Sequence, residues 1–178
     1  VYLLFASIIL VEVSDMKMEA NSVSAFNIYS IIVLISFFLF LFLLITNVSS
    51  AFLLSNIIII WLFDTFSYLG GKLIGGIKLM PKISSGKTIS GLISGIFLTL
   101  FISEIFFNSF FINMKLSIFY VLLIIILSFI GDALVSLLKR YVDIKDSGNI
   151  MPGHGGLLDR FDSFIIVFFV IGILQLAV

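Results

Sequence analysis

Cysteine is absent from this chain of 178 residues, and charged residues make up only 11% of it. Without cysteine the protein has no disulfides, no thiolate metal ligands and no cysteine nucleophile. The formal net charge is zero, so there is no polybasic arm to bind nucleic acid. The sequence also lacks a P-loop, a G-x-S-x-G pattern and a histidine pair with zinc-ligand spacing. The signatures of several common enzyme classes are therefore missing.

Apolar residues dominate what is present. They account for 61% of the chain, and the mean hydropathy is +1.31, whereas soluble domains are about half apolar and about a quarter charged. A chain of this size cannot hide so much apolar surface from water, so lipid must be its solvent. Segments that cross lipid must satisfy their backbone groups internally. We therefore predict an all-α, polytopic transmembrane fold that forms one integral-membrane domain over residues 1–178.

The apolar segments set the expected number of membrane spans. The first, 1–11, ends near Glu12 and is about half of the roughly 20 residues that a span needs. We therefore expect the natural start of the protein, with one or more earlier helices, to be missing. The longer segments are 28–45, 48–70, 89–107, 116–138 and 164–178. The sequence thus predicts about five full spans plus a partial N-terminal helix.

Basic residues indicate the orientation of these spans. Loops on the cytoplasmic side of a membrane carry an excess of lysine and arginine. If the third segment ends on the cytoplasmic side, only Lys115 of the ten basic residues lies outside. We expect an inner-membrane protein, as in bacteria, whose two long polar loops, after the third and fifth segments, face the cytoplasm.

Acidic residues occur where lipid makes them costly, and such residues suggest function. Asp64 and Asp132 lie several residues inside apolar runs, and the sixth segment is preceded by Asp159 and Asp162. Carboxylates without cysteine suit a hard cation such as Mg²⁺, and nearby basic residues suit phosphate. This combination predicts a site for a nucleoside triphosphate. The competing interpretation is that these are interfacial side chains that reach water and pair with each other.

A glycine-rich segment, Pro152-Gly153-His154-Gly155-Gly156, precedes the sixth segment. Its glycines would let backbone N–H groups approach a phosphate. Taken alone, a loop histidine flanked by glycines, such as His154, is more often a solvated residue in a turn than a ligand.

Residues 136–162 as a whole resemble the diagnostic motif of the phosphatidate cytidylyltransferase family. That motif has Ser, Lys-Arg, Lys-Asp, Pro-x-His-Gly-Gly and Asp-Arg-x-Asp at fixed spacing. The matching residues are Ser136, Lys139, Arg140, Lys145, Asp146, Pro152, His154, Gly155, Gly156, Asp159, Arg160 and Asp162. A second block, from Asp64 to Gly91, is similar to the family's second conserved region, so the resemblance covers about 60–170. Val135 departs from the pattern, because the family often has Glu there.

The resemblance implies an enzyme that transfers CMP from CTP to phosphatidic acid and releases pyrophosphate, in phospholipid biosynthesis. A phosphate oxygen of the lipid would attack the α-phosphorus of CTP without a covalent enzyme intermediate. Catalysis would then consist of positioning and charge neutralisation. The expected partners are CTP, phosphatidic acid and the lipid bilayer, with a second copy of the chain as a further candidate.

The resemblance also assigns roles to individual residues. Asp132, Asp159 and Asp162 would bind Mg²⁺, with a second cation as an option, because two-cation sites recur in this chemistry. The residues expected to bind CTP or the lipid phosphate are Lys82, Lys87, Lys139, Arg140 and Arg160. Further candidates for nucleotide contact are Ser84, Thr88, His154, Gly155 and Gly156. Asp64 is either a ligand or a partner of Lys72.

Three alternatives stay open at this point. Another lipid nucleotidyltransferase or a polyisoprenoid kinase would need the same metal and phosphate groups and would differ in its lipid pocket. An ion-coupled transporter would spread its carboxylates through the depth of the membrane, whereas here they gather near one boundary. The chain could also be inactive without the helices that we expect to precede it.

Overall fold

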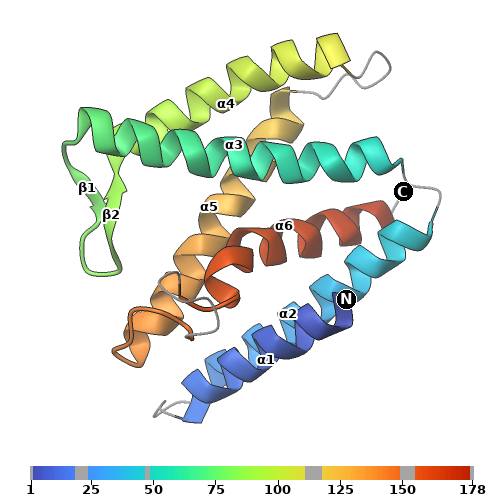
Figure 1. Ribbon diagram of the computed structural model, residues 1–178, viewed down its shortest axis with the longest axis vertical. Helices are drawn as coiled ribbons and strands as arrows, with labels where there is room; N and C mark the ends of the chain where they lie inside the picture. The colour runs from blue at the N-terminus through green and yellow to red at the C-terminus, as the bar shows by residue number, and fades with distance from the viewer. Residues whose placement is uncertain (1, 19–23, 47–48, 111–117, 149–154, 177–178) are drawn as a thin grey trace. The chain divides into compact units, whose positions relative to one another are not determined.

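The computed structural model describes residues 2–18, 24–46, 49–110, 118–148 and 155–176, which form six helices and one hairpin of two strands (Figure 1). The elements in chain order are α1 (Tyr2–Met18), α2 (Ser24–Ile45), α3 (Ser50–Ile74), β1 (Lys78–Met80), β2 (Ser84–Thr88), α4 (Ile89–Phe110), α5 (Ile118–Tyr141) and α6 (Leu158–Leu176). Each of the six apolar segments in the sequence corresponds to one of these helices.

Four of the described helical segments are long and apolar enough to cross a membrane: α2, α3, residues 89–106 of α4, and α5. This confirms the predicted all-α membrane class. The count of about five spans stays a prediction, since α6 begins with Asp159, Arg160 and Asp162 among its first five residues. The β1–β2 hairpin was not predicted. It is antiparallel, with Lys78 opposite Thr88 and Met80 opposite Ser84, and its turn contains Pro81 at a position that favours proline.

The first segment is longer than its apolar run predicts. The run ends near Glu12, but α1 continues to Met18. Glu12 is only 3% exposed, so it does not mark the polar end of a helix. The prediction of a segment ending at Glu12 was therefore wrong.

Contacts divide the chain into two compact units. The first unit contains α1, α2, α6 and the part of α5 from Ser128 onward. Within it α2 packs along α6, where the Ser36 hydroxyl donates a hydrogen bond to the Ile165 carbonyl at 2.5 Å. A Cβ at Gly172 would come within 2.6 Å of Leu39, so the absence of a side chain there allows the close approach of these two helices. Small residues and interhelical hydrogen bonds are the usual means of helix association in lipid.

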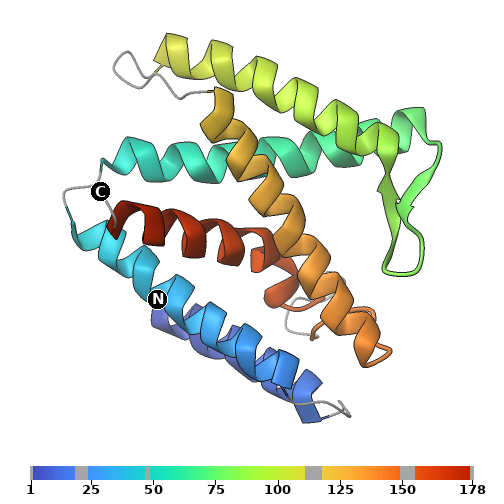
Figure 2. The ribbon, with the colours of Figure 1, turned by 180° about the vertical axis from the view of Figure 1, so that it is seen from behind.

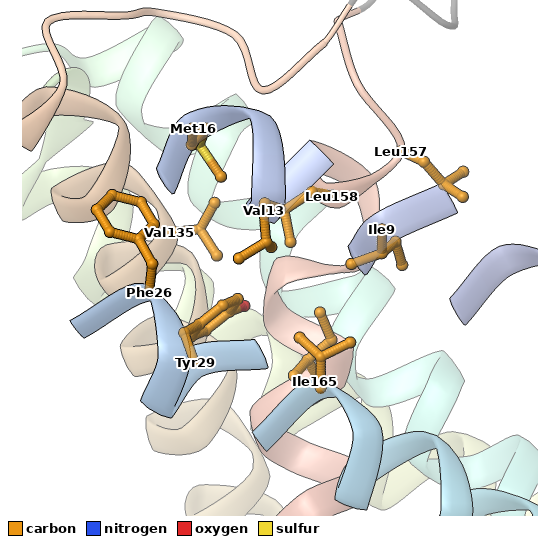
Figure 3. Packing of buried hydrophobic residues seen from close by; sticks show 10 residues of the cluster. Ile9, Val13, Met16, Phe26, Tyr29, Val135, Leu157, Leu158 and Ile165 are labelled. Atoms are coloured by element: carbon orange, nitrogen blue, oxygen red, sulfur yellow. The ribbon is translucent and has the colours of Figure 1, made fainter. Parts of the chain in front are cut away.

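The core of the first unit lies between α1, α2, α5 and the start of α6 (Figure 3). Its buried members are Ile9, Val13, Met16, Phe26, Tyr29, Val33, Val135, Leu157, Leu158 and Ile165. Val135, which stands where the related family often has Glu, is fully buried in this cluster. A carboxylate at that position would need partners inside the core, so the aliphatic side chain suits its surroundings here.

The second unit, residues 48–127, contains α3, the hairpin, α4 and the first part of α5. Figure 2 shows the hairpin running from the end of α3 back to the start of α4. The two helices approach closely because small residues line their contact: a Cβ at Gly91 would lie 2.5 Å from the Ser67 carbonyl oxygen and 3.2 Å from the Gly71 Cα. The hydroxyl of Ser94 also donates to the Phe66 carbonyl at 3.3 Å.

The end of α5 turns the chain toward α6 through a Schellman motif. The N–H of Ile144 donates to the Lys139 carbonyl at 3.0 Å, and the N–H of Asp143 donates to the Arg140 carbonyl at 3.2 Å. Asp143 has a φ of 56°, in the left-handed region that this motif requires. The motif therefore ends the helix directly after the basic pair Lys139 and Arg140.

Candidate functional site

Asp159, in the first turn of α6, contacts a side chain and two backbone amides. The Lys139 ammonium group donates to Asp159 Oδ1 at 2.6 Å and forms an ion pair with it. The backbone N–H groups of Ser147 and Gly156 donate to Oδ2 at 2.9 and 3.1 Å. One carboxylate at the start of α6 thus contacts the last turn of α5 and two residues of the loop between the helices.

The pKa of Asp159 reflects these contacts. Partial burial raises the pKa, because it disfavours the charged form. The hydrogen bond and positive charge of Lys139, together with the N–H groups of Ser147 and Gly156, outweigh burial and leave the pKa below its ordinary value. Asp159 is therefore ionised at neutral pH.

Glu12 is a second carboxylate in the same region, and it is buried. Its Oε1 accepts the N–H of Leu157 at 2.8 Å, and its Oε2 accepts the N–H of Leu158 at 2.7 Å and the hydroxyl of Ser147 at 3.1 Å. The first N–H groups of a helix have no partner within the helix, and the positive end of its dipole favours an anion. Glu12 on α1 thus caps the start of α6 from another helix.

Backbone conformation and lack of space explain why positions 155 and 156 of the predicted motif are both glycine. Gly155 has a φ of 82°, a conformation that other residues rarely adopt. A Cβ at Gly155 would also lie 2.8 Å from Asp159 Oδ2, and a Cβ at Gly156 would come within 2.1 Å of the Ser147 hydroxyl and 2.8 Å of both Glu12 oxygens. The pair therefore allows the loop to pass between the two carboxylates.

Asp132 and Asp162 flank a close contact between α5 and α6. A Cβ at Gly131 would lie 2.5 Å from the Asp162 carbonyl oxygen and 3.0 Å from the Ser163 Cα. The Asp132 carboxylate accepts the hydroxyl of Ser136 at 3.3 Å, and the Asp162 carboxylate accepts the N–H of Ser163 at 2.7 Å. Both carboxylates are half-buried.

Two further predicted residues of this unit, Arg140 and Arg160, directly follow Lys139 and Asp159 in the chain. The Arg140 guanidinium is exposed and donates to the Ile144 carbonyl at 2.8 Å, so it lies along the loop that follows α5. Arg160 is exposed on the first turn of α6. His154 lies outside the described residues, and its predicted role in nucleotide contact stays a prediction.

In the second unit, the predicted nucleotide-binding residues lie on the hairpin and at the start of α4. Thr88 is the N-cap of α4, where its hydroxyl oxygen accepts the N–H of Gly91 at 3.0 Å. Ser84 and Lys87 are half-buried on β2, and Lys82 is exposed in the turn. Asp64 is exposed on α3. Its suggested partner Lys72 has its ammonium group 5.7 Å from the centre of the Tyr68 ring, a cation–π contact.

The predicted metal ligands have suitable oxygen atoms, but their carboxylates do not form a metal-binding group in the described structure. Among the side chains that the structure describes, no three acidic or histidine residues are grouped so as to hold a metal ion. Both oxygens of Asp159 are already engaged by Lys139 and the two loop amides. The donor chemistry suits Mg²⁺, whereas this arrangement of Asp159 does not leave its carboxylate open.

Two residues of the site, Glu12 and Ser147, were missed by sequence reasoning. Glu12 carried a usable signal, because it is an acid between Val11 and Val13 in an apolar run, and the rule applied to Asp64 and Asp132 applies to it as well. Ser147 carried no such signal, since it follows two exposed charged residues in a polar loop. Its role depends on contacts that only the folded chain creates.

Comparison with known proteins gives a family match over almost the whole chain. The model of the cytidylyltransferase family matches residues 1–177. A phosphatidate cytidylyltransferase from Rickettsia bellii (strain RML369-C) is 38% identical over 168 residues, which cover 88% of this chain and 73% of that protein.

Other relatives match a shorter region at higher identity. A phosphatidate cytidylyltransferase from Staphylococcus aureus (strain COL) is 42% identical over 125 residues, or 69% of this chain and 48% of that protein. One from Bacillus subtilis (strain 168) is 45% identical over 116 residues, or 62% of this chain and 42% of that protein. The matched region thus spans less than half the length of these two relatives.

Proposed function

Because the chain belongs to the cytidylyltransferase family, we propose that the protein transfers CMP from CTP to phosphatidic acid and releases CDP-diacylglycerol and pyrophosphate. The observation that carries the proposal is that Lys139 and the N–H groups of Ser147 and Gly156 hydrogen-bond to the Asp159 carboxylate at the start of α6. This arrangement holds one acidic and one basic residue of the family-like motif together. Relatives named phosphatidate cytidylyltransferases support the choice of substrates.

The reaction joins two phosphates and needs no covalent enzyme intermediate. A phosphate oxygen of the lipid attacks the α-phosphorus of CTP, and the bond from that phosphorus to the oxygen bridging to the β-phosphorus breaks. The electron pair leaves with pyrophosphate. Catalysis then consists of alignment and of compensation of charge on the phosphates.

The basic residues divide into two groups for this task. Lys139 and Arg140 lie at the end of α5 and Arg160 at the start of α6. Lys82 and Lys87 lie on the hairpin of the second unit, with Ser84 and Thr88. We assign each group to the phosphates of CTP or of the lipid. Gly155 and Gly156 are further candidates for nucleotide contact, and Asp64 is a further candidate for substrate binding.

Mg²⁺ is the proposed cofactor, on the strength of the donor chemistry alone. Asp132, Asp159 and Asp162 would hold it, with a second cation as an option, and it would neutralise charge on the triphosphate. Lys139 would have to release an oxygen of Asp159 for that carboxylate to serve as a ligand. Removal of divalent cations with a chelator, followed by addition of Mg²⁺, tests this requirement.

The proposed location is the inner membrane, with the site facing the cytoplasm. The distribution of lysine and arginine supports this orientation, because nine of the ten basic residues would lie on one side. CTP would then arrive from water while the acyl chains of the lipid stay in the bilayer. A homodimer is a candidate assembly of the protein.

The test uses the full-length protein, purified in detergent. We would measure Mg²⁺-dependent release of pyrophosphate from CTP, with and without phosphatidic acid. Release that requires both the lipid and the metal supports the proposed reaction. Folded protein that releases no pyrophosphate in the presence of both would contradict it.

Two variants locate the site in the same assay. Asp159→Asn removes the charge that pairs with Lys139, and we expect the rate to fall about 100-fold or more. Asp143→Asn is the matched control, since Asp143 is exposed and asparagine tolerates its positive φ. Unchanged activity of Asp159→Asn would sink the site assignment.

A further inference from the structure

We propose that Glu12 is a positioning residue: its buried carboxylate holds Ser147, Leu157 and Leu158 and thereby sets the place of Asp159. This inference rests on the proposed function for its catalytic consequence. Glu12 lies outside the region that resembles the family motif, and three features of the folded chain give it this role.

The first feature is how far along the chain the contacts of Glu12 reach. Its partners Ser147, Leu157 and Leu158 lie 135, 145 and 146 residues away in the sequence. Two of them directly precede Asp159, and the third lies within the loop that follows α5. A single side chain on α1 therefore holds the start of α6 and one residue of the loop before it.

The second feature is the short path from Glu12 to Asp159. Ser147 donates its hydroxyl to Glu12 and its N–H to Asp159. Gly156 donates its N–H to Asp159, and its Cα faces both Glu12 oxygens so closely that a Cβ would lie 2.8 Å from each. The two carboxylates thus share Ser147 and Gly156, and a shift of one is transmitted to the other through two residues.

The third feature is that the surroundings of Glu12 suit an ionised carboxylate and little else. Its two oxygens face three donors, two of which are N–H groups at a helix N-terminus. Gly148 and Gly156 close the space around them, since a Cβ at Gly148 would lie 2.9 Å from Oε1. A glutamine amide in this space would turn an NH₂ group toward a backbone N–H group, which leaves a buried donor without an acceptor.

Because of these contacts, Glu12 is a positioning residue and not a catalytic one. The side chain is 3% exposed, and both oxygens are engaged by the protein's own donors. It therefore acts on the reaction through Asp159 and the loop rather than by touching a substrate.

The experiment compares three variants of the full-length protein in detergent. Glu12→Gln removes the buried charge. Asp15→Asn removes the same charge from an exposed position one turn along α1, and Ser36→Ala removes a buried hydrogen bond between α2 and α6 away from the loop. For each variant we would measure the thermal unfolding midpoint, kcat and KM for CTP, and hydrogen exchange at the amides of residues 147 and 156–158.

We expect Glu12→Gln to lower kcat about 10- to 100-fold, with a change in KM of less than about threefold, because misplacement of a reacting group by about an ångström acts mainly on the transition state. Exchange at the amides of Leu157 and Leu158 should increase at least about 10-fold, since each N–H loses a fixed acceptor. Asp15→Asn should match the wild type. Ser36→Ala should lower the unfolding midpoint while keeping kcat per folded molecule.

A kcat of Glu12→Gln that falls no further than its folded fraction, as for Ser36→Ala, would overturn the proposal. If Glu12→Gln does not fold, Ser147→Ala serves in its place, because it removes one donor to Glu12 and keeps the N–H bond to Asp159; unchanged kcat in that variant would also overturn it. A folded wild type without pyrophosphate release refutes the proposed function instead. Exchange at Leu157 and Leu158, which needs no substrate, then still decides whether Glu12 holds these residues.

Discussion

The polar residues at the start of α6 and those around the β1–β2 hairpin are held in different ways. Asp159 depends on Lys139 and loop amides, and the same loop depends on Glu12, more than 130 residues away in the sequence. Around the hairpin the contacts are short-range: Thr88 caps its own helix, and Gly91 allows α4 to approach α3. The first region thus relies on a few charged groups, and the second on backbone pairing and small residues.

This difference predicts how each region responds to substitution. Loss of a charge near Asp159 leaves buried donors without an acceptor and shifts other groups. Loss of a charge on the hairpin removes an exposed group and leaves the backbone pairing intact. Activity should therefore depend on single side chains in the first region, and stability on close helix packing in the second.

The largest effect is expected for Gly156→Ala. The new Cβ would lie 2.1 Å from the Ser147 hydroxyl and 2.8 Å from both Glu12 oxygens, so the loop must move away from one carboxylate. We expect the rate of CMP transfer to fall about 100-fold or more. The control is Gly86→Ala on β2, where a Cβ meets no atom within 4 Å. Wild-type activity in Gly156→Ala would show that the two carboxylates are not coupled through this loop.

Lys139→Gln should act through the pKa of Asp159. Lys139 lowers this pKa from its ordinary value of 3.8, so its removal should raise the pKa and move the acid limb of the kcat/KM profile to higher pH, with a rate loss of about 10- to 100-fold. The same contact stabilises the fold above pH 3.8, and this contribution disappears as the pH falls through the lowered pKa of the folded protein. The unfolding midpoints of variant and wild type should therefore converge in acid. A difference between the two unfolding midpoints that stays constant down to pH 2 would contradict a stabilising ion pair.

Gly91→Ala tests the second region, with an effect on stability rather than on chemistry. Its Cβ would lie 2.5 Å from the Ser67 carbonyl oxygen, and backbone cannot move aside as a flexible side chain does. Overpacking of this kind costs about 1–3 kcal/mol. We expect a lower unfolding midpoint and nearly unchanged kcat per folded molecule. A selective loss of kcat would instead place the α3–α4 contact in the catalytic step.

Lys82→Ala should have the smallest effect. Lys82 is exposed in the hairpin turn, so the unfolding midpoint should not change. If the ammonium group attracts the CTP phosphates, KM for CTP should rise about two- to fivefold at low salt, and the difference should shrink at high salt because exposed charges are screened. Lys82→Arg should keep the wild-type KM. A KM difference that is independent of salt would indicate a direct, buried contact.

Sequence patterns predicted the helices well because lipid leaves few alternatives. Long apolar segments without charges must be helical in a membrane, and the predicted segment 28–45 corresponds to α2, Ser24–Ile45. The end of α1 was missed because apolarity marks what lipid contacts, whereas Glu12 is covered by protein. The hairpin was missed because strands of three and five residues with lysine, serine and glycine carry little periodic signal.

The candidate site was predictable in its residues but not in its connections. The motif that contains Lys139, Gly156 and Asp159 stands out in the sequence, and the structure joins those residues by hydrogen bonds or close contact. Nothing in the sequence pairs Glu12 with Leu157 and Leu158, since contacts over 145 residues depend on tertiary folding. The reason for glycine at position 156 likewise appears only in the folded chain, where Glu12 and Ser147 occupy the space that a Cβ would take.

The most direct test of the proposed reaction uses the full-length protein and follows a radioactive label from CTP into the lipid. CTP labelled at the α-phosphorus, or separately at the γ-phosphorus, is incubated with phosphatidic acid, Mg²⁺ and protein, and the lipid fraction is extracted. If the protein transfers CMP, label enters the lipid from α-labelled CTP only, with one pyrophosphate released for each CMP transferred. Label in the lipid from γ-labelled CTP would identify a kinase and contradict CMP transfer.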